Sequence, residues 1–568
     1  MIERGTDGQL PPSVRITPVF RPKQVEKTAP CQTGCPNCGD IRGWIGVVAQ
    51  RDKMGLSRDE AYMRAWRMIT DVNPFPSVLG RVCPHPCESH CNRGELDEPL
   101  AINAMERFLG DWAIDADAPL ARIETDPRDE WIGVVGAGPS GLSFAYQMAR
   151  RGYRVTIYES RERPGGMLRY GIPDYRLPPT ILDAEIQRIL DLGIELRLGI
   201  AVGRDVSLEE LHARHAALYL GIGAQMGRGL AIPGDEGPGV WTGTDFLARV
   251  NCGEAVALGR NAVVVGGGNT AIDAARTARR AGAHVTVIYR RSREEMPAIE
   301  EEVEDALDEG IEIEFLAAPV RIDRDSGGKV RQLVACRMRL GDLDESGRRR
   351  PIPIPDSEYV LPAQTVIAAV SQAPVLQGFE ALDHDGSWLI TGDGGSIGDG
   401  ILAGGDALGL GIAGDAIVQG RRAAEELHTR LSGRTASEIR ADSRMDGRPV
   451  IDADRVMLDY KPHSRAVRAP KLPGTERIVR GAAEVASTIT EQEFLAEATR
   501  CFSCGSCFGC EQCSMFCTPG CFTKLEEVGP GMYFTLTLDH CEECGKCVEV
   551  CPCGFLEVTL PMDPGPVA

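Results

Sequence analysis

The sequence predicts a multidomain α/β protein in which two nucleotide-binding units are flanked by cysteine-rich segments. Three observations lead to this prediction. A glycine-rich turn between an apolar strand and a helix occurs twice, within residues 131–159 and 261–298. A cysteine run with the spacing C-x2-C-x2-C-x3-C also occurs twice, near the C-terminus. Six further cysteines gather in two groups between residues 31 and 91, with helical patterns between the groups.

Composition and charge exclude several classes of partner. At 568 residues the chain is long enough for three or four domains of about 150 residues each. Its formal net charge of −20 argues against nucleic acid or an anionic membrane, because the summed field repels both. No apolar run approaches the roughly 18 residues of a spanning helix, and MIERGTDGQLPPS lacks the features of a signal peptide. We therefore expect a cytoplasmic protein whose 20 cysteines act as metal or redox ligands rather than as disulfides.

The N-terminal cysteines lie among prolines and histidines, as in VCPHPCESHC, which fits cluster ligation better than buried apolar thiols. The segments CPNCGDIRGWI, GRVCPHPCESHCNRG and AINAMERF resemble the helical iron–sulfur domain of the glutamate synthase small subunit and of dihydropyrimidine dehydrogenase. The resemblance implies that one cluster is held by three cysteines and a carboxylate, namely Cys35, Cys83, Cys87 and Glu106.

The same resemblance implies a second N-terminal cluster, held by an early CxxC together with Cys31 and Cys91. This chain has no cysteine before Cys31. In the family the missing CxxC typically ends a helix in a form like EAxRCLxC, and the C-terminal segment EFLAEATRCFSC carries Cys501 and Cys504 in that form. We therefore predict a cluster held by Cys31, Cys91, Cys501 and Cys504, which joins the two ends of one chain or of two chains in a dimer.

Residues 131–159 fit the whole dinucleotide fingerprint: an apolar strand, a glycine-rich turn, a helix and a second strand that ends in an acid. This combination is far more specific than a glycine-tight turn without a ligand. The pyrophosphate is expected at the helix N-terminus and the acid on a ribose hydroxyl. The expected site residues are Gly136, Gly138, Pro139, Ser140, Gly141 and Glu159.

Two later segments resemble flavin-binding parts of the same family. RPGGMLRYGIPDYRLP resembles the segment that covers FAD and approaches its ring, and GGDALGLGIAGDAIVQG resembles the motif whose aspartate meets the ribityl or phosphate region. The resemblance therefore implies FAD in the first site. It adds Gly166, Met167, Leu168, Gly405 and Asp406 to the expected site.

A second fingerprint lies inside the first unit. Alanine replaces its third glycine, as the fingerprint permits, and the segment predicts a second dinucleotide. The turn and helix start contain Gly266, Gly268, Asn269, Thr270 and Ala271. Where NAD-binding domains tend to have an acid, this chain has Arg290 and Arg291, which suit a 2′-phosphate. We therefore expect NADPH in preference to NADH, although both arginines could instead contact a pyrophosphate or a surface acid.

The duplicated C-terminal run has the spacing of bacterial two-cluster ferredoxins, in which the fourth cysteine of each run serves the other cluster. Zinc gives no reason for the duplication, and disulfides fit no better. One 4Fe–4S cluster is assigned to Cys507, Cys510, Cys513 and Cys551, and the other to Cys541, Cys544, Cys547 and Cys517. We expect the remaining cysteines to be non-ligands, namely Cys38, Cys252, Cys336, Cys521 and Cys553, although Cys38 and Cys553 lie beside ligands and could substitute for them.

These segments predict a multidomain α/β architecture with the second Rossmann-like unit inserted in the first. The expected domains are a helical N-terminal iron–sulfur domain (1–125), an FAD-binding domain in two parts (126–255 and 366–433), an NAD(P)H-binding domain (256–365), a linker (434–490) and a bacterial ferredoxin-like domain (491–568). The linker is rich in Pro, Arg and Asp, so it is expected to be an ordered strap or a flexible connection that lets the tail return to the N-terminal domain.

The combination of cofactors predicts electron transfer, because flavin converts between a two-electron hydride donor and one-electron clusters. The sequence offers no Ser-His-Asp set or paired-carboxylate site, and we assign no catalytic residue. We expect an NAD(P)H:acceptor oxidoreductase subunit with FAD and four 4Fe–4S clusters. Its partner would be a ferredoxin or a ferredoxin-dependent enzyme, such as a 2-oxoacid or acyl-CoA oxidoreductase, in a hetero-oligomeric complex.

Two alternatives remain. The chain could be a glutamate synthase small subunit, although that subunit normally ends after the flavin domain. It could also be a regulator with structural or redox-sensing clusters. The sequence leaves the acceptor, the direction of electron flow and electron bifurcation open.

Overall fold

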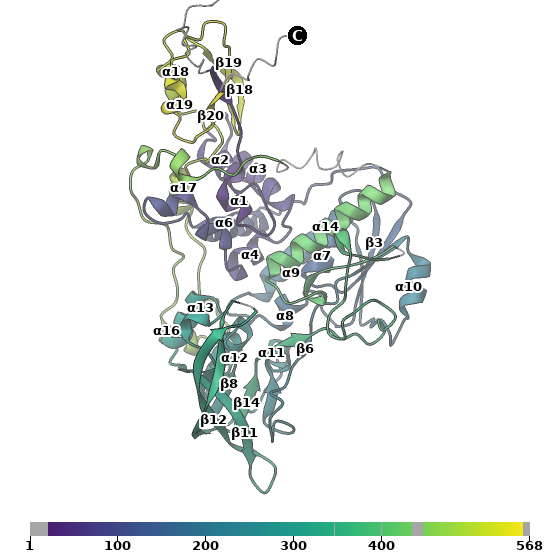
Figure 1. Cartoon of the computed structure of the whole chain (residues 1–568). Helices are drawn as coiled ribbons and strands as arrows, with labels where there is room; N and C mark the ends of the chain where they lie inside the picture. Colours follow the sequence, from purple (N-terminus) through teal and green to yellow (C-terminus); the bar gives the residue numbers. More distant parts are fainter. Residues whose placement is uncertain (1–20, 346, 399, 434–446, 560–568) are drawn as a thin grey trace, which may run out of the picture.

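The computed structural model describes residues 21–345, 347–398, 400–433 and 447–559. Figure 1 shows four units and how they adjoin. The C-terminal cysteine module lies on the helical N-terminal unit, the first nucleotide-binding unit lies beside that helical unit, and the second nucleotide-binding unit lies at the opposite end from the module. The helical unit therefore stands between the flavin-type fold and the ferredoxin-like module.

The helical unit is built from short amphipathic helices. In α3 (Arg58–Thr70) the buried residues Ala61, Tyr62, Ala65, Trp66 and Ile69 recur at the spacing of one helical face, and a capping box from Ser57 and Glu60 starts the helix. The other helices are α1 (Pro30–Thr33), α2 (Ile41–Ala49), α4 (Pro76–Val82), α5 (Pro86–Ser89) and α6 (Ile102–Asp115). Helix α17 (Glu491–Arg500) from the far end of the chain contributes Phe494 and Ala498 to the same core.

The first nucleotide-binding unit has a six-stranded sheet in the order β16-β17-β5-β2-β3-β4, parallel except at its β16 edge. Its strands are β2 (Trp131–Val135), β3 (Arg154–Glu159), β4 (Glu195–Leu198), β5 (Ala217–Leu220), β16 (Ser396–Gly398) and β17 (Ile401–Ala403). Helices α7 (Pro139–Ala149) and α14 (Ala413–Ser432) pack against each other, and α8 (Met167–Tyr170), α9 (Pro179–Leu190) and α10 (Leu208–Arg214) complete the unit. Because β5 and β17 are neighbours, the chain leaves this sheet and returns to it after the intervening unit.

That intervening unit has a five-stranded parallel sheet in the order β10-β9-β8-β14-β7. Its strands are β7 (Val240–Thr242), β8 (Asn261–Val265), β9 (His284–Tyr289), β10 (Glu312–Phe315) and β14 (Thr365–Ala368), with helices α11 (Gly243–Asn251), α12 (Asn269–Arg280) and α13 (Glu300–Asp308). An antiparallel sheet of β11 (Ala317–Arg324), β12 (Val330–Leu343) and β13 (Arg349–Pro362) extends from it. The two crossover segments pair as β6 (Met226–Gly227) and β15 (Gln372–Ala373). The predicted multidomain α/β architecture, with the second Rossmann-like unit inserted in the first, is confirmed.

The C-terminal module is held partly by the N-terminus of the described chain. Strand β1 (Arg21–Gln24) pairs antiparallel with β20 (Leu556–Thr559), the last strand. The module also contains α18 (Gln512–Met515), the hairpin of β18 (Phe522–Gly529) and β19 (Met532–Leu536), and α19 (Lys546–Glu549). Residues 21–24 thus lie on the module formed by the other end of the chain, while residues 1–20 lie outside the described chain.

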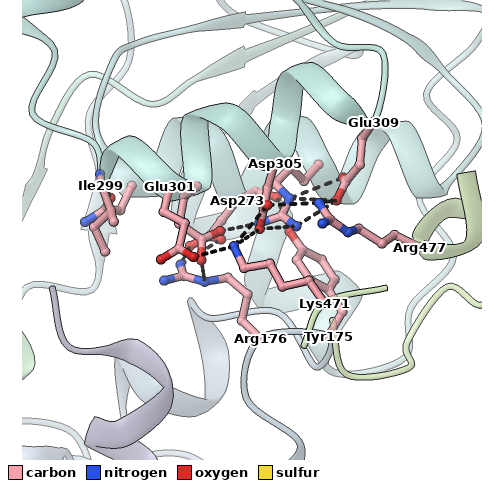
Figure 2. A network of polar contacts seen from close by, with 12 residues as sticks. Tyr175, Arg176, Asp273, Ile299, Glu301, Asp305, Glu309, Lys471 and Arg477 are labelled. Atoms are coloured by element: carbon pink, nitrogen blue, oxygen red, sulfur yellow. Dashed lines mark hydrogen bonds and ion pairs between the residues drawn. The ribbon is translucent and has the colours of Figure 1, made fainter. Parts of the chain in front are cut away.

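Residues 447–490 form an ordered strap rather than a flexible connection, and residues 434–446 lie outside the described chain. The strap runs from the module to α16 (Gly474–Val479) beside α13 and then returns to α17 (Figure 1). Buried charges fix it there: Arg477 pairs with Asp305 at 2.9 Å, and Lys471 pairs with Asp305 at 3.1 Å (Figure 2). Buried apolar residues, among them Ile451 and Val456, add to these ionic contacts, although the segment has no clear periodicity that would have predicted its order.

Candidate cofactor and cluster sites

A large cleft opens at the carboxyl ends of β2, β3 and β5. This is the edge at which parallel α/β sheets bind ligands. Most of the expected flavin-site residues line it, namely Gly136, Gly138, Pro139, Ser140, Glu159, Gly166, Met167, Gly405 and Asp406. Leu168 lies instead in the apolar core of the unit, where it is 3% exposed.

The three fingerprint glycines each meet a different steric demand. A Cβ on Gly136, whose φ is +99°, would lie 2.4 Å from the Gly221 carbonyl oxygen, and one on Gly141 would lie 2.0 Å from the Gly136 oxygen. The nearest atom to a Cβ on Gly138 would be the Gly166 Cα, at 3.8 Å. Helix α7 begins directly after Gly138, so its unpaired N–H groups face open space suited to a pyrophosphate.

The acids at the cleft have distinct surroundings. Glu159 accepts backbone N–H bonds from Ala137 at 2.8 Å and Arg161 at 2.9 Å, which fixes the glycine-rich turn against β3. Burial raises the pKa of Asp406 to about 6, although an N–H bond from Gly411 opposes that rise. Both carboxyl groups line the cleft, where they can accept hydrogen bonds from ribose or ribityl hydroxyls.

The second fingerprint has the same local geometry. A Cβ on Gly266 would lie 2.2 Å from the Ala369 oxygen, whereas nothing lies within 4 Å of one on Gly268, which precedes α12. Asn269 accepts the N–H of Ile299, so it anchors the segment that leads into α13 (Figure 2 labels Ile299). Ala271 is fully buried, and Thr270 lies on the first turn of α12.

The two arginines expected at the 2′-phosphate behave differently. Arg291 is buried: it pairs with Asp344 at 2.6 Å and donates to the Arg349 carbonyl at 2.8 Å. Arg290 is exposed and has no hydrogen bond or ion pair with any other residue that the structure describes. Arg290 is therefore the guanidinium that is available to an incoming ligand.

The first N-terminal ligand set comes together within the helical unit. The predicted ligands Cys35, Cys83, Cys87 and Glu106 line one cavity. Asn73 donates to the Glu106 carboxylate at 2.8 Å, and burial raises the pKa of Glu106 to about 7. Burial, followed by the proximity of Cys35 and Glu106, raises the pKa of Cys87 well above its ordinary value. Three thiols and one carboxyl group thus surround one buried space. As thiolates and a carboxylate they are the kind of anionic ligands that bind the iron of a cluster.

The set drawn from both ends of the chain also comes together. Cys31, Cys91, Cys501 and Cys504 line one cavity. Burial, and then the adjacent Cys91, Cys501 and Cys504, raise the pKa of Cys31 well above its ordinary value. Sequence separation therefore does not prevent Cys501 and Cys504 from filling the place of the missing CxxC.

The structure brings the members of each C-terminal set near one another, and the crossed ligand assignment remains a prediction. Cys507, Cys510, Cys513 and Cys551 line a common cavity, and burial together with the other three raises the pKa of Cys513 to about 12. Burial has the largest effect on the pKa of Cys547, followed by the proximity of Cys517, Cys544 and Cys541. Together they raise this pKa to about 11.

In the described part of the chain, no three His, Cys, Asp or Glu side chains come close enough to hold one metal ion. Tetrahedral zinc needs four thiolates at about 2.3 Å from one centre, whereas the thiolates around a 4Fe–4S cluster are further apart. That the four donor sets hold 4Fe–4S clusters remains a prediction.

Several polar groups near the thiols escaped the sequence analysis. Asn92 donates its side-chain N–H to the Cys504 Sγ at 3.7 Å, and the Ser503 backbone N–H donates to the Cys501 Sγ at 3.4 Å. Arg42 donates to the Cys504 carbonyl at 2.8 Å. No motif marks these residues, because their role depends on the folding of the tail onto the helical unit.

Two cysteines expected to be non-ligands lie close to proposed ligands. The Cys553 Sγ is 3.8 Å from the Cys551 Sγ, and Cys521 donates its backbone N–H to the Cys517 Sγ at 3.3 Å. Both thiols are buried. The non-ligand assignment of Cys252, Cys336 and Cys38 remains a prediction; Cys252 is exposed.

No helix in the described ranges 21–433 and 447–559, residues 346 and 399 apart, has the length and apolarity to cross a membrane.

Two family models match the chain. Residues 130–423 match "pyridine nucleotide-disulphide oxidoreductase", and residues 24–118 match "dihydropyrimidine dehydrogenase domain II, 4Fe-4S cluster". Among solved structures, Mycobacterium tuberculosis FprA in complex with NADPH is similar at 20% identity and a TM-score of 0.48, over 66% of this chain and all of that chain.

Three curated relatives illustrate the range of the family. The NADP(+)-dependent formate dehydrogenase subunit beta of Moorella thermoacetica is 36% identical over 84% of this chain and 70% of its own length. The NADPH-Fe(3+) oxidoreductase subunit beta of Geobacter sulfurreducens is 39% identical over 64% of this chain, which spans 54% of that subunit. The glutamate synthase (NADPH) small chain of Escherichia coli is 31% identical over 70% of this chain and 87% of its own length.

The two matched models cover the nucleotide-binding and helical units, and the relatives include subunits of multi-subunit oxidoreductases. The resemblance drawn from the motifs is therefore confirmed. The chain belongs to the pyridine nucleotide-disulphide oxidoreductase family, as one of its iron–sulfur flavoproteins.

Proposed function

We propose that the chain is the subunit of an NADPH-dependent oxidoreductase that carries electrons between NADPH, FAD, four 4Fe–4S clusters and a partner protein. When bound, FAD supplies the conversion between two-electron and one-electron transfer. The observation that carries the proposal is the continuity of the sites: each candidate site is linked to the next by a helix or by a short stretch of chain.

The flavin cleft and the first donor set meet at α14. Gly405 and Asp406 in the cleft lie just before this helix, and Gly414 in its first turn lines the cavity of Cys35 and Glu106. Helix α1 and the turn after it then connect the two N-terminal sets, because Cys31 and Cys35 are four residues apart.

The remaining steps are equally short along the chain. Cys504 and Cys507 belong to adjacent sets and are three residues apart, so their Cα atoms lie within about 11 Å. Cys513 and Cys517 belong to the two C-terminal sets and are four residues apart. This sequence of neighbours supports a single route from the flavin cleft through the helical unit to the module.

Arg290 supports NADPH as the nicotinamide donor. It is exposed at the end of β9, where a 2′-phosphate is recognised in this type of fold. The relatives whose printed names include NADP(+) or NADPH agree with this choice. Replacing Arg290 with Glu should therefore raise the KM for NADPH more than that for NADH.

The partner is proposed to be a ferredoxin or another oxidoreductase subunit, such as a 2-oxoacid, acyl-CoA or formate-type enzyme. The names of two relatives mark them as beta subunits, which supports assembly into a complex. The alternative, a glutamate synthase small subunit, is supported by the 31% identity to the Escherichia coli chain, but it gives no role to the two C-terminal donor sets.

Anaerobic stopped-flow reduction of the iron-loaded protein tests the proposal. NADPH should reduce the flavin and then give cluster signals in electron paramagnetic resonance. Flavin reduction without any cluster signal would contradict the proposed route and favour structural or sensing clusters. Formation of glutamate with a glutamine-dependent large subunit would favour the alternative.

A further inference from the structure

The end of the C-terminal module carries an exposed apolar pair beside an exposed thiol. Met515 is 73% exposed and Phe516 is 48% exposed, at the end of α18. The Lys546 Nζ lies 6.0 Å from the centroid of the Phe516 ring, and Lys546 begins α19 two residues after Cys544. Cys544 is exposed, whereas every other proposed cysteine ligand is buried or half-buried. The apolar pair thus lies near the most accessible of the proposed ligands.

The module that carries the apolar pair and the exposed thiol is rich in acidic side chains. Residues 501–559 contain eight acidic and only two basic side chains, and the two lysines are each paired with an acid of the module. Asp539 and Glu542 are exposed, next to the second cysteine run, and no described residue forms an ion pair with either. The module therefore presents a negative field around its accessible thiol.

The position in the molecule is also suited to docking. Figure 1 shows α18 and α19 at the end opposite the second nucleotide-binding unit. A protein that contacts this end reaches the module without touching the cleft or Arg290. The face defined by Met515, Phe516, Asp539, Glu542 and Cys544 is called the distal face below.

We propose that the distal face docks a redox protein or subunit whose contact surface has a basic rim and an apolar centre, and that electrons cross beside Cys544. This inference rests on the proposed function. Each crossing reduces one haem or iron–sulfur centre of the partner by one electron, so two crossings and the release of one proton balance the oxidation of one NADPH to NADP⁺.

The charges argue against a second copy as the occupant. The chain carries a net charge of −20, so two distal faces repel each other, whereas a basic surface is attracted. Two apolar side chains form only a small centre, which fits a transient electron-transfer contact of less than about 1,200 Å².

Binding of cytochrome c, a basic one-electron haem protein, tests the proposal by titration calorimetry on the iron-loaded full chain. The double variant Asp539→Asn/Glu542→Gln should raise the Kd about three- to tenfold at low salt, and added salt should reduce that difference. The matched control, Glu209→Gln/Glu312→Gln, removes two exposed acids far from the module and should leave the Kd unchanged. Iron content and cluster spectra of each variant verify that the module remains intact.

The variant Met515→Ser/Phe516→Ser tests the apolar centre and should also weaken binding, with less dependence on salt. Equal loss in the control variant, or no binding of cytochrome c to the unmodified protein, would overturn the inference. Reduction of flavin and clusters by NADPH is measured separately without cytochrome c. Normal reduction with unaltered binding in the variants refutes the docking face alone, whereas absent reduction refutes the proposed function.

Discussion

The segment after residue 447 contacts the rest of the chain in two chemically different ways. Where it reaches the second nucleotide-binding unit, the contact is a buried charge network: Arg477 meets Asp305, and Glu309 pairs with Arg276 at 2.7 Å and Arg280 at 2.5 Å (Figure 2). We call it the charged contact.

Where the segment reaches the helical unit, the contact is apolar and ends in thiols. Phe494 of α17 stacks on Phe108 with 4.3 Å between ring centroids and meets Tyr62 edge to face at 5.4 Å. Cys501 and Cys504 follow at once, beside Cys31 and Cys91. We call this region the joint.

The difference indicates that one kind of contact sets the position of the strap and another kind attaches the C-terminal segment to the helical unit. Buried charges need well-matched partners and contribute little net stability, but removing one partner is costly, so the charged contact fixes where the strap lies. Apolar burial, together with the proposed shared cluster, is expected to supply attachment. The predictions below test this division of roles.

The largest effect is expected from Cys501→Ser/Cys504→Ser. Without two of its four thiols the joint loses its proposed cluster, and α17 should lose protection from amide hydrogen exchange while α16 keeps its protection. The control Cys252→Ser/Cys336→Ser removes two cysteines outside every donor set. Unchanged protection of α17 would show that apolar packing alone holds the joint.

Phe494→Ala should lower the free energy of unfolding by about 3–5 kcal/mol, because the ring is fully buried and its loss leaves a cavity. Chemical denaturation followed by circular dichroism measures this change. Val479→Ala, on the strap but 87% exposed, serves as the control and should change stability by less than about 0.5 kcal/mol. Similar losses in both variants would contradict the account of the joint.

Arg477→Met should have a smaller effect, about 1–3 kcal/mol. The guanidinium is buried, but Asp305 retains Lys471 at 3.1 Å and Arg276 at 3.5 Å, so its carboxylate is not left unpaired. Local hydrogen exchange at α16 should rise while exchange at α17 does not. A loss as large as that of Phe494→Ala would mean that the charged contact also supplies attachment.

Lowering the pH should destabilise the charged contact before it destabilises the joint. Of the effects predicted here, this one is expected to be the smallest near neutral pH. Burial favours the neutral form of Glu309, but Arg280 and Arg276 outweigh burial and hold its pKa below the ordinary value. A depressed folded pKa contributes stability above the unfolded value of about 4.5 and loses it as pH falls towards the folded value. Exchange at α16 should therefore rise below about pH 4.5, and Glu309→Gln should remove this dependence.

The sequence predicted the two regions unequally, and the reason is physical. Cys501 and Cys504 stood out because a family motif lacked a CxxC at one end and supplied one at the other. No sequence motif marks the charged contact. Its residues, Asp305, Glu309, Lys471 and Arg477, belong to segments whose charges resemble ordinary surface charges.

The nucleotide sites show the same contrast. Local turns such as Gly136 to Gly141 were predictable because backbone sterics require glycine there. The burial of Leu168 and the pairing of Arg291 with Asp344 were not, because both depend on packing between segments distant in sequence.

The central claim is that one cluster takes ligands from both ends of the chain, and iron and sulfide counts on anaerobically reconstituted protein test it most directly. Four clusters correspond to about sixteen irons per chain. The account predicts that Cys501→Ser/Cys504→Ser lowers the count to about twelve, with the signals of the other clusters retained, and that Cys31→Ser/Cys91→Ser causes the same loss. A count that stays at about sixteen in either variant would contradict the joint.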